Sequence, residues 1–151
     1  MWIRRGGKAQ FEELAAIWEA SVLATHGFLR DADFAALKSE VPEIYLPSLE
    51  ELWLCGIRGK LAGFLGCDGP CVEMLFVAPE FFRMGVGRKL LAHARELHGP
   101  LSVSVNRDNR GALQFYLRNG FSLIGASPLD GQGRPYPVLH LAQQRETEGS
   151  G

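Results

Sequence analysis

Hydrophobic residues near the start of the chain follow a helical rhythm. Apolar positions between residues 11 and 22 recur at steps of three and four, which predicts an amphipathic helix. This stripe consists of Phe11, Leu14, Ala15, Trp18 and Val22. A second helix is predicted over residues 31–40 and is expected to end before Pro42, because proline breaks helical hydrogen bonding. Asp31 or Asp33 is a candidate for its N-terminal cap.

Three apolar runs follow, and they predict β-strands. Residues 52–57 and 61–66 flank the short segment Arg58-Gly59-Lys60, which is typical of a tight hairpin. Residues 71–77 form the third run, and none of the three alternates cleanly between apolar and polar positions. A strand that is apolar on both sides is covered on both sides, so we expect helices on both faces of the sheet.

Helices and strands alternate in the remainder of the chain. A helix over residues 85–98 has one apolar face and ends at Gly99-Pro100, and another helix over residues 109–119 is closed by Gly120. Further strands are predicted at residues 3–5, 101–106, 121–124 and 138–141. The predicted order β-α-α-β-β-β-α-β-α-β-β fits one domain over residues 1–151, with a polar tail that frays from about residue 143.

Composition narrows the class of protein without naming an activity. The chain has 151 residues, 46% of them hydrophobic, and a formal net charge of -1. These values are typical of one globular domain and argue against nonspecific nucleic-acid binding, which needs a basic surface. No apolar run is long enough to cross a membrane, and the first residues lack a secretion signal, so we expect a cytoplasmic protein that binds no membrane.

The three cysteines are interpreted as small apolar residues in strands. Cys55, Cys67 and Cys71 are odd in number, and the last two lack neighbouring His or Cys residues at zinc-ligand spacing. We therefore expect neither a disulfide framework nor a metal site. His93 and His98 lie five residues apart on a polar helix face and are expected to be solvated.

The turn that precedes residue 86 carries the strongest chemical signal. A strand runs into this turn, and the following helix opens with Gly85-Val86-Gly87. Glycines let the backbone approach a ligand closely, and the free N–H groups and positive dipole end of a helix suit phosphate. Arg83, Arg88 and Lys89 add positive charge at the same place. A pyrophosphate-bearing cofactor fits the turn, and a plain loop and cap is the alternative for an isolated pair of glycines.

Two segments together resemble the GCN5-related N-acetyltransferase (GNAT) family. Residues 82–91 look like its acetyl-CoA pyrophosphate loop, and residues 109–121 resemble its second signature, N-x-x-A-x-x-x-Y-x-x-x-G-F. Similarity extends over most of residues 3–141, and residues 24–29 and 133–137 resemble the YjaB-like bacterial members. Phe82 stands where the family pattern has Arg or Gln. Because main-chain amides do most of the anion binding in this family, cofactor binding is expected to survive that departure.

The resemblance implies a fold, a cosubstrate and a set of contacts. The implied fold is α/β, with a mixed, mostly antiparallel sheet of six to seven strands and helices on both faces. Two neighbouring strands, ending near Val77 and Asn106, are expected to separate and admit the pantetheine arm of acetyl-CoA. The residues that the resemblance assigns to acetyl-CoA are Leu75, Phe76, Val77, Arg83, Met84, Gly85, Val86, Gly87, Arg88, Asn109, Ala112 and Tyr116.

The resemblance also gives Tyr116 the role of donor to the departing thiolate. A phenol with a pKa of ~10 is protonated at neutral pH and can donate to the sulfur of a thiol with a pKa of ~8.5. The alternative for Tyr116 is a packed aromatic ring beside Phe115 and Phe121, and the alternative for Asn109 is a plain N-terminal cap.

The acceptor amine must lose a proton before it attacks the thioester. Some family members use a glutamate on the strand after the glycine helix, but Ser104 stands there and is no base. Glu73 is the leading substitute, because an acid inside an apolar strand needs a cleft or a partner. His26 is the second candidate, since histidine suits proton transfer near neutral pH, and Tyr136 is expected near the same pocket. A surface-facing glutamate and a helix-end histidine are the open alternatives.

The predicted function is transfer of an acetyl group from acetyl-CoA to a primary amine by direct attack in a ternary complex. An acetyl-cysteine intermediate is disfavoured because all three cysteines precede the glycine turn and lack a neighbouring activating base. The acceptor is expected to be a small molecule or a peptide, no metal is required, and the protein is expected to be a monomer or a homodimer. The alternative, favoured by Ser104 and Phe82, is a non-catalytic acyl-CoA-binding or interaction protein on the same fold.

Overall fold

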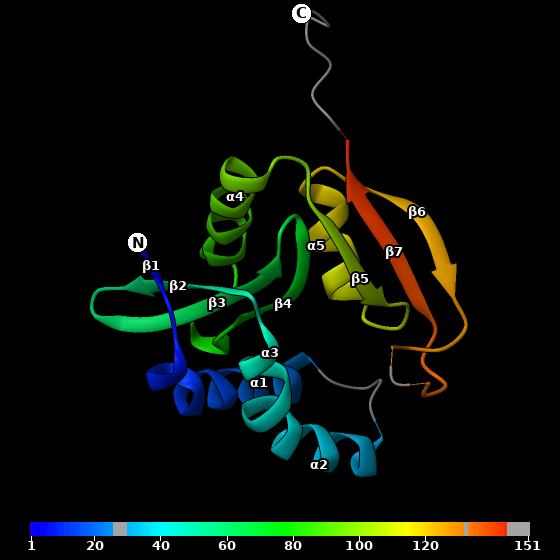
Figure 1. Ribbon diagram of the computed structural model, residues 1–151, viewed down its shortest axis with the longest axis horizontal. Helices are drawn as coiled ribbons and strands as arrows, with labels where there is room; N and C mark the ends of the chain where they lie inside the picture. Colours follow the sequence, from blue (N-terminus) through cyan, green and yellow to red (C-terminus); the bar gives the residue numbers. More distant parts are fainter. Residues whose placement is uncertain (26–29, 132, 145–151) are drawn as a thin grey trace, which may run out of the picture.

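The computed structural model describes residues 1–25, 30–131 and 133–144, which form a seven-stranded sheet covered by helices (Figure 1). The first half contains β1 (Trp2–Arg5), η1 (Lys8–Gln10), α1 (Phe11–Thr25), α2 (Asp31–Glu40), η2 (Val41–Tyr45), α3 (Leu46–Ser48), β2 (Glu51–Ile57), β3 (Lys60–Asp68) and β4 (Cys71–Val77). The second half contains η3 (Pro79–Phe81), α4 (Val86–His98), β5 (Ser102–Asn106), α5 (Arg110–Arg118), β6 (Phe121–Ser127) and β7 (Val138–Gln143). The order of the main helices and strands confirms the prediction. Within the described residues, no helix has the length and hydrophobicity that crossing a membrane requires.

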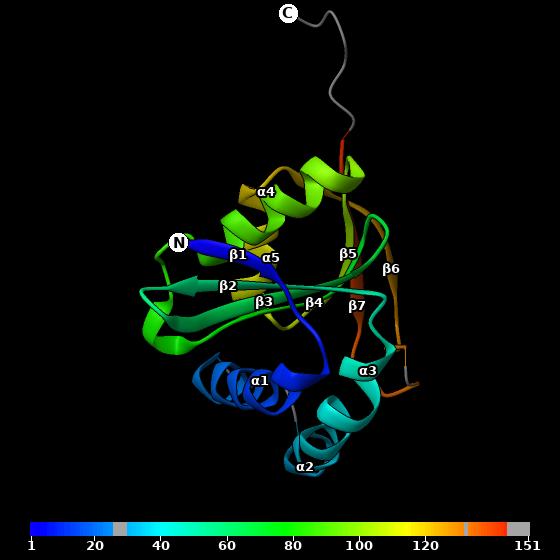
Figure 2. The same ribbon diagram turned by 60° about the vertical axis from the view of Figure 1, so that its left-hand side comes forward.

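The sheet separates two hydrophobic cores. Helices α4 and α5 cover one face, and α1, α2 and α3 cover the other (Figures 1 and 2). On the first face, Leu90 of α4 packs in the same cluster as Leu65 of β3. On the second face, Leu14 and Trp18 of α1 pack with Phe64, the neighbour of Leu65 on the same strand. Successive strand residues thus face opposite cores, which explains why the strands lack a polar side.

The strand order is β1-β2-β3-β4-β5-β7-β6, and the pairing of β4 with β5 is the parallel one. The two strands pair only at Cys71 with Ser102 and at Val72 with Val103. Beyond these positions β4 runs on to Val77 and β5 to Asn106 without pairing with each other. The predicted separation of these strands is therefore present, and it leaves an edge of β4 open on the side of β5.

A β-bulge marks the point where the two strands part. On β3, Gly66 pairs with Met74 and Cys67 pairs with Val72, so Glu73 has no partner residue in this ladder. An extra residue on one strand of an antiparallel pair redirects its side chain. Glu73 is exposed and lines a pocket together with Met74, whose side chain packs in the core under α1. The bulge thus turns Glu73 towards the face that α1 to α3 cover.

The second helix stops before Pro42, as predicted, because α2 ends at Glu40. The helical path continues through the π turn η2 into α3, and the N–H of Leu46 bonds to the carbonyl of Val41, five residues back. Val41 donates to the carbonyl of Leu37, and Pro42, which has no N–H, ends this ladder of α2. Val41 and Leu46 are buried, so this irregular turn is stabilised by the core beneath it.

Two predictions about the ends of elements need correction. The N-terminal cap of α2 is Arg30 with an extended backbone and no side-chain cap, and Asp33 bonds elsewhere. Gln143 does not fray: its N–H bonds to the carbonyl of Leu101, and its side chain accepts from Arg95 and from the N–H of Leu101. The remainder of the predicted tail, residues 145–151, lies outside the described residues.

Candidate active site

The turn between β4 and α4 has the backbone of an anion-binding loop. Arg83 has a φ of 65° and Gly85 a φ of 85°, both in the left-handed region. A left-handed residue next to helical ones turns successive N–H groups towards one point, which suits a phosphate. The first amide of α4 to bond back is that of Lys89, at 3.0 Å from the carbonyl of Gly85. The amides of Val86, Gly87 and Arg88 therefore precede the helical hydrogen-bond ladder and are available to an anion.

Three cations surround this loop. Arg83, Arg88 and Lys89 are all exposed. Among the residues that the structure describes, none of the ion pairs involves these three side chains. Their charges are thus not taken up by these ion pairs, and their role at a bound anion stays a prediction. Met84 is also exposed, at 49%.

The two glycines of the loop have different physical roles. A Cβ on Gly85 would meet only Met1, at 3.9 Å, so this position is open and needs glycine for its left-handed backbone. A Cβ on Gly87 would lie 2.9 Å from the ring of Phe115, so this glycine allows α5 to pack closely against α4. Val86 and Gly87 are buried, so the side chain of Val86 is structural and both residues offer only their amides to the loop.

The predicted contacts from β4 and α5 border the separated strands. Leu75 and Val77 pack towards α4, whereas Phe76 packs towards α1, so what these three residues can offer to a ligand is the open backbone edge of β4. Asn109 caps α5 by accepting from the N–H of Ala112 at 3.2 Å. Asn109 therefore acts as an N-terminal cap, which was the alternative to a contact with the cofactor. This cap fixes the start of the helix that carries Tyr116.

Tyr116 lies in the core between two aromatic rings. It is 6% exposed and makes edge-to-face contacts with Phe115 and Phe121, at centroid distances of 5.2 and 5.1 Å. Tyr116 is therefore packed between aromatic rings, as the alternative interpretation of this residue expects. A catalytic role for Tyr116 stays a prediction. Burial raises the pKa of the Tyr116 phenol well above its ordinary value of 10, so the hydroxyl keeps its proton at every physiological pH.

Glu73 stands on the wall of an acidic pocket. The pocket has a volume of about 370 Å³ and is lined by Tyr45, Ser48, Leu49, Glu50, Asp68, Glu73 and Met74. Three of these residues are carboxylates. A hydrogen bond and the charge of Asp68 raise the pKa of the neighbouring Glu50, which shows that negative charge is concentrated here. The pocket suits a cationic ligand and adjoins the point where β4 and β5 part.

Ser104 belongs to a hydrogen-bonded row that the sequence did not reveal. Its hydroxyl lies 2.9 Å from Nδ1 of His140, and Nε2 of His140 lies 2.8 Å from the hydroxyl of Ser127. Val103 and Val105 face the core under α4, so Ser104 points to the same face as Glu73. Val72 and Val103, which precede Glu73 and Ser104, form the last pair between β4 and β5. Only the cross-strand pairing of Ser104 with His140 brings this histidine to the site, and spacing along the chain gives no sign of it.

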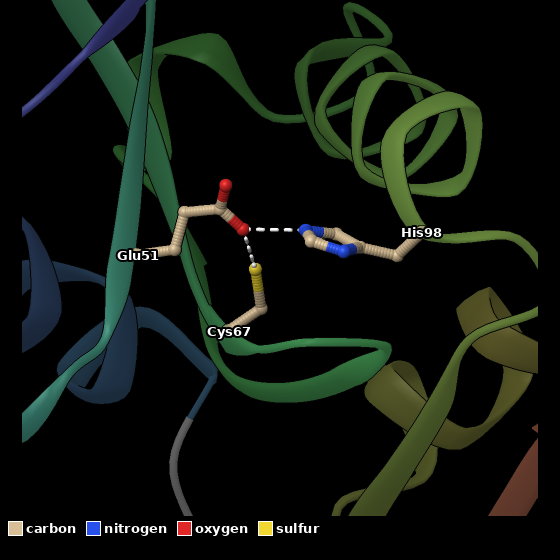
Figure 3. Close-up of side chains that lie close together, drawn as sticks. All are labelled: Glu51, Cys67 and His98. Atoms are coloured by element: carbon tan, nitrogen blue, oxygen red, sulfur yellow. Dashed lines mark hydrogen bonds and ion pairs between the residues drawn. The ribbon is translucent and has the colours of Figure 1, made fainter.

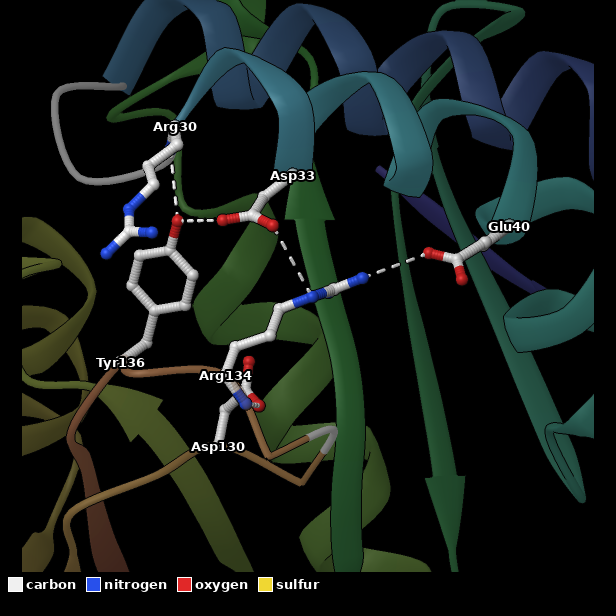
Figure 4. Close-up of polar contacts among 6 residues, drawn as sticks. All are labelled: Arg30, Asp33, Glu40, Asp130, Arg134 and Tyr136. Atoms are coloured by element: carbon white, nitrogen blue, oxygen red, sulfur yellow. Dashed lines mark hydrogen bonds and ion pairs between the residues drawn. The ribbon is translucent and has the colours of Figure 1, made fainter.

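A polar network ties the connection between β6 and β7 to α2 (Figure 4). The hydroxyl of the buried Tyr136 donates to the carboxylate of Asp33 and accepts from the N–H of Arg30. Arg134 contacts Asp33 at 3.6 Å and Glu40 at 3.4 Å. Tyr136 thus fastens this segment instead of lining the acidic pocket, and the predicted base His26 lies outside the described residues.

The cysteines lie in strands, as predicted, and are poor nucleophiles. Burial raises the pKa of Cys55 and of Cys71, and the charge of Glu73 raises that of Cys71 further. Burial and a hydrogen bond to Glu51 raise the pKa of Cys67 to about 12. The prediction of two solvated histidines is wrong. His93 packs its ring edge-on against Trp53 at 4.2 Å, and Nε2 of His98 lies 2.5 Å from Glu51.

A turn with a backbone suited to phosphate at the start of α4, a pair of separated strands beside it and an acidic pocket at their junction fit an acyltransferase that uses a coenzyme A thioester and an amine. The chain belongs to the GNAT acetyltransferase family: the model of the Acetyltransferase (GNAT) domain matches residues 48–123. It is therefore an acetyl-CoA-dependent N-acetyltransferase.

Relatives support this assignment along nearly the whole chain. The peptidyl-lysine N-acetyltransferase YjaB of Escherichia coli is 38% identical over 141 residues, which cover 93% of this chain and 95% of that protein. The solution structure of the apo form of YjaB superimposes with a TM-score of 0.85 at 39% identity, over 93% of this chain and 95% of the other. The PaiA N-acetyltransferase of Thermoplasma acidophilum, in complex with coenzyme A, shares the fold with a TM-score of 0.74 at 19% identity, over 95% and 98% of the two chains. The predicted resemblance to the YjaB-like members is confirmed.

Proposed function

We propose that this enzyme acetylates the side chain of lysine residues in proteins or peptides. The observation that carries the proposal is the acidic pocket beside the junction of β4 and β5, with Glu50, Asp68 and Glu73 in its lining. A lysine side chain is a cation on an apolar stem, and three carboxylates attract it while Leu49 and Met74 contact the stem. The name of YjaB, a peptidyl-lysine N-acetyltransferase, points to the same acceptor.

The proposed acetyl-CoA site uses the two signatures in sequence order. The amides of residues 85–88 bind the pyrophosphate, with Arg83, Arg88 and the dipole of α4 adding attraction. The open edge of β4 over residues 75–77 bonds to the amides of the pantetheine arm, as an added strand would. Ala112 and Tyr116 lie on one stripe of α5, Asn109 caps the start of this helix, and the three border the thioester from the side opposite β4.

We propose direct transfer. The neutral amine nitrogen attacks the carbonyl carbon of the thioester, the C–N bond forms, the C–S bond breaks and coenzyme A leaves as a thiolate. The proton that the nitrogen loses as the amide forms goes to the thiolate, which is released as the free thiol. The raised pKa of Tyr116 makes its phenol a weaker acid than a thiol, so Tyr116 stabilises the thiolate by donating a hydrogen bond. The raised pKa values of Cys55, Cys67 and Cys71 disfavour an acetyl-cysteine intermediate.

Two groups are proposed to take the proton of the incoming ammonium. Glu73 is the nearer, since it lines the acceptor pocket at the junction of the strands. His140 is the second, reached through the hydroxyl of Ser104, and an imidazole is the side chain best suited to proton transfer near neutral pH. His26 stays a third candidate from the sequence.

Acetylation of a defined set of amines tests the proposed acceptor. We expect a peptide with an internal lysine and a blocked N-terminus to be acetylated faster than a lysine-free peptide with a free N-terminus. The double variant with Glu50→Gln and Asp68→Asn is expected to raise KM for the lysine peptide roughly tenfold, because it removes two charges from the pocket. Glu43→Gln, an exposed acid outside the pocket, serves as the matched control.

The two possible failures of this experiment are distinct. If the lysine-free peptide reacts faster, the acceptor assignment is wrong and the acetyltransferase activity stands. If acetyl-CoA binds and no peptide, polyamine or antibiotic amine is acetylated, the non-catalytic alternative gains support.

We also propose that the enzyme acts in the cytoplasm as one domain over residues 1–151. Within the described residues all three cysteines are free thiols, as is usual in a reducing compartment. Fractionation of cells that express the chain tests the compartment.

A further inference from the structure

Three donor side chains from three different elements meet at the end of the sheet that is remote from the glycine turn (Figure 3). Glu51 is the first residue of β2, Cys67 lies near the end of β3, and His98 is the last residue of α4. Glu51 and Cys67 are direct cross-strand partners, so their side chains share a face of the sheet. Cys67 packs in the core under α4, and that is the helix from which His98 reaches back.

The donor atoms already converge. Oε2 of Glu51 lies 3.1 Å from Sγ of Cys67 and 2.5 Å from Nε2 of His98. All three donor atoms lie within 4.8 Å of one another. One carboxylate oxygen of Glu51 therefore contacts both the thiol and the imidazole. A single metal ion between the three donor atoms can replace these two hydrogen bonds.

We propose that Glu51, Cys67 and His98 bind one divalent transition-metal ion, with Zn²⁺ as the ion that this donor set favours. A thiolate, an imidazole and a carboxylate are the three ligand types of protein zinc sites. Tetrahedral bonds of ~2.0–2.3 Å place ligand atoms about 3.5 Å apart, so the present contacts need to open by roughly 1 Å or less. Three protein ligands leave a fourth position for water.

The surroundings support a cation at this place. Cys67 is fully buried, whereas the side chains of Glu51 and His98 are 15% and 23% exposed, so an ion has a path from solvent. Arg5 contacts the other oxygen of Glu51 at 3.5 Å and leaves Oε2 to the ion. The negative charge of Asp68 acts on Cys67. When the ion binds, the S–H proton of Cys67 goes to solvent and His98 binds as a neutral imidazole with its proton on Nδ1, while Zn–S, Zn–N and Zn–O bonds form.

Such an ion would fasten the C-terminal end of α4 to β2 and β3. The N-terminal end of the same helix carries the proposed pyrophosphate amides, at the other end of its 13 residues. The inferred ion is therefore a structural clip for the helix and takes no part in acetyl transfer. It stands or falls independently of the acceptor and of the catalytic residues.

Titration of the metal-free protein with Co²⁺ and Zn²⁺ tests the proposal. With Co²⁺ we expect a thiolate-to-metal absorption band in the near ultraviolet at one equivalent, and with Zn²⁺ a rise in Tm together with proton release. Cys67→Ser should abolish the band, and His98→Gln should weaken Zn²⁺ binding more than about tenfold, since even groups that only orient ligands contribute ~10–100-fold.

Two matched variants separate this site from adventitious binding. Cys71→Ser removes a thiol from the adjacent strand, and His93→Gln removes an imidazole from the same helix; both should leave the band and the affinity unchanged. The proposal is overturned if wild-type protein binds Zn²⁺ no more tightly than His98→Gln does, or if Cys71→Ser abolishes the band. His98 lies at the rim and keeps the test decisive even where Cys67→Ser fails to fold.

Discussion

Gly87 in the first turn of α4 lies against the ring of Phe115 in α5, so closely that a Cβ would come within 2.9 Å of the ring. Phe115 in turn packs edge-to-face on Tyr116. The absence of a side chain at Gly87 therefore sets the distance between the helix that starts at the phosphate loop and the helix that carries the proposed thiolate donor. One glycine links the two signatures of the family through packing.

Gly87→Ala is expected to destabilise the protein by about 1 kcal/mol, because overpacking costs ~1–3 kcal/mol and the gain in helix propensity returns ~1 kcal/mol. Gly111→Ala is the matched control. Gly111 also lies in a helix, but a Cβ there would meet nothing within 4 Å, so we expect a gain of about 0.5 kcal/mol. Urea unfolding of the two variants measures both values. Equal effects at the two positions would show that the contact with Phe115 is unimportant.

Gly85→Glu is expected to weaken acetyl-CoA binding roughly 100-fold, a loss of about 2.7 kcal/mol. The new carboxylate places bulk and negative charge where the amides of α4 face the pyrophosphate. Gly99→Glu is the control, because Gly99 has a similar positive φ of 78° at the opposite end of the same helix. Calorimetry with acetyl-CoA distinguishes them. If both variants lose the same affinity, backbone strain explains the loss and the phosphate loop does not.

Burial of Tyr116 should make the stability of the protein depend on alkaline pH. The folded-state pKa of the phenol is raised above its ordinary value of 10, so the neutral form is favoured in the folded state. This contribution is fully present below pH 10 and is lost as the pH rises through the folded-state pKa. Denaturant unfolding between pH 8 and pH 11 should show a steeper loss for wild type than for Tyr116→Phe. Parallel curves would contradict the burial of this hydroxyl.

The sequence predicted the fold well because its strongest signals are local. The stripe of α1, the glycines at both ends of α4 and the apolar runs of β2 to β4 all act within a few residues, and the structure confirms them. The end of α2 at Glu40 was predicted correctly from Pro42, but the π turn η2 that follows it was not predicted. Here the buried Val41 and Leu46 hold a wide turn that accommodates the proline, and burial depends on distant parts of the chain.

The residues of the site were harder to predict from the sequence than the fold was. Glu73 was recognisable as an acid in an apolar strand, but its orientation depends on a bulge set by pairing with β3. His140 reaches the site because β7 pairs with β5 in a register that places it opposite Ser104, 36 residues away in sequence. Glu51 and His98 meet Cys67 through a strand pairing and a helix end, so a search for metal-ligand spacing along the chain could not find them. Each of these contacts joins segments whose relative placement only the folded sheet determines.

Removal of the proton acceptor should give a characteristic pH–rate profile. We expect the variant that lacks the base, Glu73→Gln or His140→Gln, to lose about 100-fold in kcat at pH 7. Its rate should recover as the pH approaches the lysine pKa of ~10.4, because the substrate then supplies its own neutral amine. Tyr116→Phe is the control: it loses a donor to sulfur, so its rate should stay low across the same range. If neither Glu73→Gln nor His140→Gln shows recovery, both assignments are wrong.

Tyr136→Phe should loosen the segment between β6 and β7 from α2. The substitution removes the hydroxyl that donates to Asp33 and accepts from Arg30, and hydrogen bonds to a charged group contribute about 1.5–3 kcal/mol. Asp33 keeps Arg134 at 3.6 Å, so we expect a loss of about 1–2 kcal/mol in the free energy of unfolding. A double-mutant cycle with Asp33→Asn measures the coupling directly. A coupling of at least about 0.5 kcal/mol is expected for side chains in one network, and additive effects would show that the two side chains act independently.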